Sequence, residues 1–142
     1  MSIEQIKQDI IDEFNLFDDW MDRYDYLIDQ GKNLAPLDGK YKNDEYLIKG
    51  CQSQVWLHAY LNEDGNVVFE ADSDAIITKG MIALLIRVFS DQKPKDIEKA
   101  DIDFLDKIGL KEQLSPTRSN GLMSMVKQMK FYAIAFQSKG IE

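Results

Sequence analysis

The chain has 142 residues, of which 44% are hydrophobic and 30% charged, and its formal net charge at pH 7 is −8. This length suits one domain that buries its own core, so we predict a single domain over residues 1–142. The acidic balance argues against nucleic acid or an anionic membrane as a partner. No stretch approaches the roughly 20 apolar residues of a membrane span. The N-terminus does not read as a signal peptide, so we expect a cytoplasmic protein.

The first two predicted elements are helices. Ser2 and Gln5 form a capping box, and hydrophobic residues then recur at helical spacing. Either Asp18 or Asp19 is placed to cap a second helix, and Gly31 is placed to end it. Both helices therefore have a predicted start, and the second also has a predicted end.

Acidic residues are concentrated in these two helices. Eight Asp and Glu residues lie between positions 9 and 29, together with a single Arg. A solvated helix face and a docking surface for a basic partner both account for such a cluster. The sequence leaves both interpretations open.

A hairpin is predicted after a polar loop. Residues 30–45 contain two Gly and one Pro, which is typical of a loop, and the hydrophobic period then changes to two. We predict a short strand over Tyr46–Lys49 and a clearer one over Gln54–Leu61. The turn sequence NEDGN is followed by a returning strand, on which one face carries Val67, Phe69 and Ala71.

Helices return in the second half of the chain. Ser73 or Asp74 is expected to cap a mostly buried helix, in which Gly80 would permit close packing at a cost of about 1 kcal/mol of helix propensity. Pro94 opens a short helix, and residues 102–108 form another. The last helix is the most periodic, with a stripe of Leu122, Met125, Val126, Met129, Tyr132, Ala133 and Phe136. This order predicts an α+β domain with a small antiparallel sheet packed against N- and C-terminal helices.

Cys51 is the leading candidate for chemistry. It is the only cysteine, directly after Gly50 and just before the longer predicted strand. One Cys excludes an intramolecular disulfide, and with one His it leaves no Cys/His zinc site of the usual make-up, so we expect a free thiol. A preceding glycine lets the backbone turn and another molecule approach, and the thiolate is the reactive form. An inert cysteine is the alternative.

The remaining polar residues point less clearly to chemistry. His58 is the only histidine that could serve Cys51 as a base, but it lies on a predicted strand, where packing in the sheet is the simpler interpretation. Asp74 reads most simply as a helix cap, and Arg118 as a capping or loop-pinning residue before the last helix. No nucleophile-elbow, phosphate-loop or dinucleotide motif is present.

Three sequence blocks stand in order along the chain: GCQSQVW at Gly50–Trp56, DSDAIITKGMIALL at Asp72–Leu85, and IGLKEQLSPTRSNGLMSM at Ile108–Met125. In their order and spacing, and with the loop sequence APLDGKYK before them, they resemble the SufE family of sulfur-acceptor proteins. The resemblance covers nearly the whole chain and implies a SufE/IscU-like fold.

The resemblance implies that Cys51 accepts sulfur as a persulfide from a cysteine desulfurase of the SufS type or a paralogue, and stimulates that enzyme. The sulfur would pass to an iron–sulfur scaffold of the SufBCD type. The chain would then be an accessory protein and not an independent enzyme. It would need no cofactor or metal, because pyridoxal phosphate belongs to the desulfurase and transfer between thiols needs only a nucleophilic thiolate.

The resemblance also implies how the site works. The cysteine loop would shield the thiol in a mostly apolar hollow and swing out when the partner docks, with Gly50 as one hinge. Arg118 would hold the docking surface or favour the thiolate. The supporting or docking residues would be Gly50, Gln52, Ser53, Asp74 and Arg118. We expect a monomer, because every strong apolar stripe can be used in one core.

Two alternatives from other classes remain open at this point. The chain could be a small thiol hydrolase or peroxidase that uses Cys51 with His58, and His58→Ala would then abolish activity on a small substrate. It could also be a pure interaction module in which Cys51 is inert. In that case Cys51→Ser would still stimulate a desulfurase.

Overall fold

The computed structural model describes residues 1–140, with side chains as far as Ser138, so the last two residues of the predicted domain lie outside it. In chain order its elements are α1 (Ile3–Phe14), α2 (Trp20–Lys32), the 3₁₀ turn η1 (Gly39–Tyr41), β1 (Val55–Leu61), β2 (Val67–Ser73), α3 (Ile76–Phe89), α4 (Pro94–Lys99), α5 (Asp103–Lys107), α6 (Leu110–Gln113) and α7 (Pro116–Gly140). The predicted α+β class is confirmed, and η1 and α6 are additions to the predicted elements.

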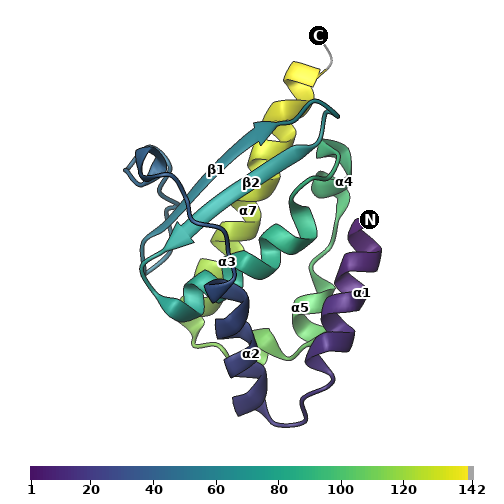
Figure 1. The fold of residues 1–142 in the computed structure, drawn as a ribbon, viewed down its shortest axis with the longest axis vertical. Coiled ribbons are helices and arrows are strands. Elements are labelled where there is room, and N and C mark those ends of the chain that lie inside the picture. The colour runs from purple at the N-terminus through teal and green to yellow at the C-terminus, as the bar shows by residue number, and fades with distance from the viewer. Residues whose placement is uncertain (141–142) are drawn as a thin grey trace.

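The sheet is the predicted antiparallel hairpin. Val55 of β1 lies opposite Ser73 of β2, and Leu61 lies opposite Val67. One face of the hairpin is buried because α3 and α7 lie behind it (Figure 1). The short strand predicted at Tyr46–Lys49 is reduced to a single bridge, in which Leu47 pairs with Trp56. The pairing ends there because the chain turns at Gly50, which has a positive φ.

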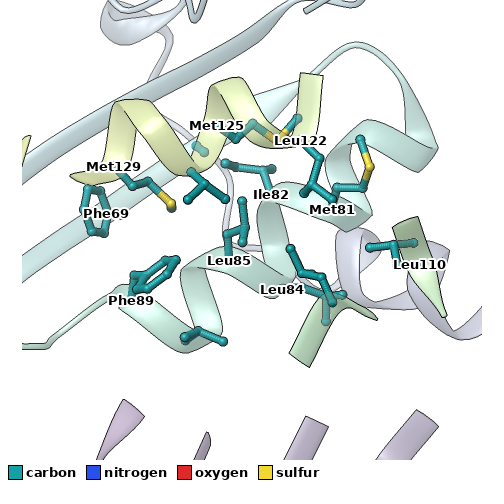
Figure 2. Close-up of a cluster of buried hydrophobic side chains, with 14 of the residues drawn as sticks. Phe69, Met81, Ile82, Leu84, Leu85, Phe89, Leu110, Leu122, Met125 and Met129 are labelled. Atoms are coloured by element: carbon teal, nitrogen blue, oxygen red, sulfur yellow. The ribbon is translucent and has the colours of Figure 1, made fainter. Parts of the chain in front are cut away.

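The core is organised around α3. This helix is buried on almost every side, because α2, β2 and α7 all pack against it. Figure 2 shows Ile82 and Leu85 of α3 beside Met125 and Met129 of α7, with Phe69 of β2 close by. The helix α2 packs mainly on α3, whereas α1 packs on both α3 and α5, so that α3 lies between the N-terminal helices and the sheet (Figure 1).

Two glycines permit the close contact between α2 and α3. A Cβ atom on Gly80 would lie 2.4 Å from the carbonyl oxygen of Leu27, and one on Gly31 would lie 2.7 Å from the backbone nitrogen of Gly80. The predicted packing role of Gly80 is therefore confirmed. The prediction that Gly31 ends the second helix is wrong, because α2 continues to Lys32 with Asn33 as its C-cap. Gly31 is present because no side chain fits there.

Within residues 1–140, no helix has the length and apolarity needed to cross a membrane.

Candidate functional site

Cys51 lies on the loop that enters β1. Its side chain is half-buried, and the thiol Sγ lies 3.5 Å from the carbonyl oxygen of Gly121, to which it donates a hydrogen bond. Gly121 is buried in the second turn of α7, and a Cβ atom there would lie 3.6 Å from Sγ. The thiol is thus held against the start of α7, 70 residues away in sequence.

Gly50 fixes how the loop approaches α7. Its φ is +91°, a conformation that residues with a Cβ atom rarely adopt. A Cβ atom on Gly50 would also lie 2.5 Å from the hydroxyl oxygen of Ser124, one turn along α7 from Gly121. Gly50 therefore meets two separate requirements, a left-handed backbone and a close approach to the helix.

The thiol opens into a small hollow of about 90 Å³. The hollow lies between the loop, α3 and α7, and its lining residues are Cys51, Gln52, Ser53, Thr78, Met81, Thr117, Arg118, Gly121 and Met125. Met81 and Met125 also belong to the core between α3 and α7 (Figure 2). The floor of the hollow is therefore continuous with the core, while Gln52 and Arg118 at its edge are exposed.

The other end of the loop is anchored to the turn between β2 and α3. The Asp74 carboxylate accepts a hydrogen bond from the backbone N–H of Gln54 at 3.0 Å, and the Ser73 hydroxyl donates to the carbonyl of Gln54 at 2.8 Å. The prediction that Ser73 or Asp74 caps α3 is wrong, since Ala75 is the N-cap and makes no side-chain bond. Both side chains hold Gln54 instead.

Burial controls the charge state of the thiol. It raises the pKa of Cys51, because a thiolate is poorly solvated in a partly apolar hollow. Arg118 lines the same hollow, but its guanidinium Nη1 donates to the hydroxyl of Tyr24 on α2 at 2.7 Å. In this arrangement burial disfavours the thiolate form of Cys51.

His58 does not take part in this site. Its Nδ1 lies 2.9 Å from a carboxylate oxygen of Glu70, and its ring stacks on Tyr41 with centroids 3.8 Å apart. His58 is not among the residues that line the hollow. The packing interpretation of this histidine therefore agrees with its contacts, and Cys51 has no base from that strand.

Several residues of the site were not predicted from the sequence. Gly121 and Ser124 receive the loop, Thr78 and Met125 line the hollow, and Tyr24 binds Arg118. The small residues at positions 121 and 124, three apart beside the apolar stripe of α7, were a usable signal of a close approach on that side of the helix. Nothing in the sequence linked Tyr24 to this region.

The arrangement suits exchange of a group between sulfur atoms. A single thiol is held on a surface loop, and among residues 1–140 no three His, Cys, Asp or Glu side chains are grouped so as to hold a metal ion. A thiolate can attack a sulfur–sulfur bond without a metal or a base of its own. Fold and site together define a small α+β domain that presents one sheltered thiol.

Comparisons with known proteins agree with this fold. The fold matches the solution structure of a hypothetical protein from Thermus thermophilus with a TM-score of 0.77, over 94% of this chain and 96% of that one, at 18% identity. The profile of the SufE family, described as an Fe-S metabolism associated domain, matches residues 8–133. The chain belongs to the SufE family.

Similar sequences carry the family's name. The chain is 42% identical to the SufE-like protein 1, chloroplastic/mitochondrial, of Arabidopsis thaliana over 95% of its own length but only 36% of the length of that larger protein. It is also 42% identical to an uncharacterized SufE-like protein of Rhizobium meliloti, over 85% of this chain and 89% of the other. A similar protein of Rhizobium etli is 42% identical over 85% and 84%.

Proposed function

We propose that Cys51 accepts sulfur from the persulfide of a cysteine desulfurase, and that the chain passes this sulfur on for the assembly of iron–sulfur clusters. The observation that carries the proposal is the position of the only thiol, on a glycine-hinged loop and sheltered against α7. Membership of a family associated with Fe–S metabolism supports it.

The transfer balances without an oxidant or reductant. The Cys51 thiolate attacks the outer sulfur of the desulfurase persulfide, and a new S–S bond forms on Cys51 as the S–S bond of the donor breaks. The desulfurase cysteine leaves as a thiolate and takes up the proton that Cys51 released. A second thiol nearby would convert the persulfide to a disulfide and expel the sulfur, so a lone cysteine fits a carrier.

Cys51 is sheltered in the structure, whereas sulfur transfer requires the donor to reach the thiol. We therefore assign shelter and transfer to two different states of the loop. With the loop seated, burial raises the pKa of Cys51 and limits reaction with small oxidants. Transfer requires the loop to leave α7, and the hinge would be Gly50, whose positive φ is rarely adopted by residues with a Cβ atom. Asp74 would hold the other end at Gln54. Gln52 and Ser53, between these points, would move with Cys51.

We also propose which kinds of protein donate and receive the sulfur. The donor would be a pyridoxal-phosphate desulfurase of the SufS type or a paralogue, and the recipient a scaffold of the SufBCD type, both in the cytoplasm. The chain itself would act as a monomer, without a cofactor and without turnover of its own. Exposed Arg118 and Gln52, at the mouth of the hollow, would meet the donor.

Alanine formation from cysteine tests the proposal. A persulfide left on the desulfurase blocks its next turnover, so an acceptor should raise the steady-state rate. We expect the wild-type chain and His58→Ala to raise it equally and Cys51→Ser not to raise it. Stimulation that survives Cys51→Ser would favour an interaction module with an inert cysteine. An activity on small substrates that His58→Ala abolishes would favour a hydrolase or peroxidase.

A further inference from the structure

Arg118 is fixed by a contact from another part of the chain. Its guanidinium Nη1 donates to the Tyr24 hydroxyl at 2.7 Å, and its backbone N–H donates to the Ser115 hydroxyl at 3.3 Å. Tyr24 is half-buried and packs against Trp20, with ring centroids 5.7 Å apart. The tyrosine is therefore the better-anchored partner, and it determines where the exposed guanidinium lies.

Among the residues that the structure describes, Arg118 is also the only charged side chain that lines the Cys51 hollow. The other lining groups are the polar or apolar side chains of Gln52 and Ser53 on the loop, Thr78 and Met81 on α3, and Thr117, Gly121 and Met125 on α7. Four other charged residues lie near the lining residues in the chain, namely Lys49, Asp74, Lys79 and Lys127, and none of them lines the hollow. The Asp74 carboxylate accepts a hydrogen bond from Gln54, Lys79 pairs with Asp72, and Lys49 and Lys127 are exposed.

We propose that Tyr24 is a positioning residue that holds Arg118 away from the Cys51 thiol while the loop is seated. Release of the Tyr24 hydrogen bond lets the guanidinium turn into the hollow and favour the thiolate. The biological meaning of this control rests on the proposed sulfur transfer, but the control itself is a property of the free chain.

The chemistry favours such a device. A cation close to a thiol stabilises the thiolate and opposes the effect of burial. Tyr24 and Arg118 come from α2 and α7, and the guanidinium is exposed, so a docking partner has access to this contact. The thiol would then stay neutral in the free protein and become nucleophilic when a partner displaces the contact.

The pH dependence of Cys51 alkylation by iodoacetamide, measured on the full chain without any desulfurase, tests this inference. We expect Tyr24→Phe to lower the midpoint of the pH profile by about one unit and to raise the rate at pH 7 about tenfold, since the rate follows the thiolate fraction. The plateau at high pH should stay the same. Arg118→Ala alone should keep the wild-type midpoint, because Tyr24 already holds the guanidinium away.

The double variant Tyr24→Phe/Arg118→Ala tests whether the Arg118 guanidinium causes the lower midpoint expected in Tyr24→Phe. We expect it to return the midpoint to the wild-type value, and Tyr60→Phe, on the exposed face of the sheet, to behave as wild type. A higher plateau with an unchanged midpoint would mean that Tyr24 only restricts access, and this would overturn the inference. A lower midpoint that persists in the double variant would overturn it as well. Neither result depends on sulfur transfer.

Discussion

Gly50 is the residue that decides where the Cys51 thiol lies. Its positive φ turns the loop, and its missing side chain lets the loop approach Ser124. Gly65 in the hairpin turn has a similar φ of +78°, but a Cβ atom there would meet nothing within 4 Å. Substitutions at the two positions therefore distinguish the effect of backbone strain from the effect of the contact with α7.

We predict that Gly50→Ala displaces the loop and that Gly65→Ala does not. Both variants carry a strain of about 1 kcal/mol from the left-handed backbone, but only the first must also push Ser124 away. The rate of thiol labelling by a disulfide reagent should rise several-fold in Gly50→Ala and stay at the wild-type rate in Gly65→Ala. Equal labelling of both variants would show that Ser124 does not hold the loop.

At the scale of single residues, the sequence predicted the cysteine loop, Asp74 and Arg118, but not Gly121 and Ser124, against which the loop lies. Cys51 and Gly50 are adjacent in the chain, and the family resemblance brought Asp74 and Arg118 to the same region, where the structure places them. The contact with Gly121 spans 70 residues, and the Tyr24–Arg118 bond spans 94. Such contacts depend on how the helices pack. The local sequence pattern of either segment does not predict that packing.

The central element is α3, and its contact with α2 is the tightest constraint on the fold. Gly31 and Gly80 allow the two backbones to meet, so that neither glycine has room for a methyl group. In an isolated helix, alanine would be preferred over glycine by about 1 kcal/mol. Here close packing outweighs helix propensity.

We predict that Gly80→Ala lowers the free energy of unfolding by about 1 to 3 kcal/mol, since overpacking of a tight contact exceeds the gain in helix propensity. Urea denaturation measures this change. Gly39→Ala is the matched control, because a Cβ atom there would meet nothing within 4 Å, and it should leave the midpoint within error. A stabilised Gly80→Ala variant would show that α2 and α3 can move apart freely.

The starts and ends of the helices show where predictions from local sequence patterns are wrong. Ser2 and Asp19 cap α1 and α2 as the sequence predicts, because capping is a contact between near neighbours. Ser73 and Asp74 have the same residue types, yet they bind Gln54 across the hairpin. Gly31 likewise has the residue type of a helix end, but its role is to permit the close contact between α2 and α3. A residue type that suits a cap is equally suited to a long-range contact.

At the scale of the whole molecule, a charged network joins the first three helices. Arg87 of α3 binds both carboxylate oxygens of Glu13 on α1 at 2.8 Å and the side-chain oxygen of Gln30 on α2 at 3.0 Å. The Arg87 hydrogen bonds lower the pKa of Glu13, against the opposing effect of burial, and a hydrogen bond from Tyr26 adds to the lowering. Glu13 therefore binds a proton less readily in the folded chain than in the unfolded one.

This difference predicts a loss of stability in acid. A lowered pKa stabilises the fold at pH values above the unfolded pKa of about 4.3, and the contribution is lost as pH falls through the folded pKa. Arg87→Met should cost about 1 to 2 kcal/mol at pH 7 and progressively less below pH 4. Urea denaturation at several pH values measures this. Lys111→Met, which loses only a 3.9 Å exposed pair with Asp106, should run parallel to wild type.

The overall class was predictable because it depends on periodicity, which each segment carries by itself. The hairpin, the buried α3 and the long α7 all follow from hydrophobic spacing. Their arrangement was less predictable. The packing of α2 on α3 depends on the fit at Gly31 and Gly80, which appears only when the two helices are brought together.

The most direct test of sulfur transfer to Cys51 is the intact mass of the chain after one round of transfer. A desulfurase is loaded with persulfide, freed of cysteine, and mixed with the pure chain. We predict a gain of one sulfur, about 32 Da, on Cys51 that a thiol reductant reverses, together with an equal loss from the desulfurase and no gain in Cys51→Ser. A desulfurase that keeps its sulfur in the presence of the wild-type chain, including a desulfurase of a second type, would contradict a carrier role for Cys51.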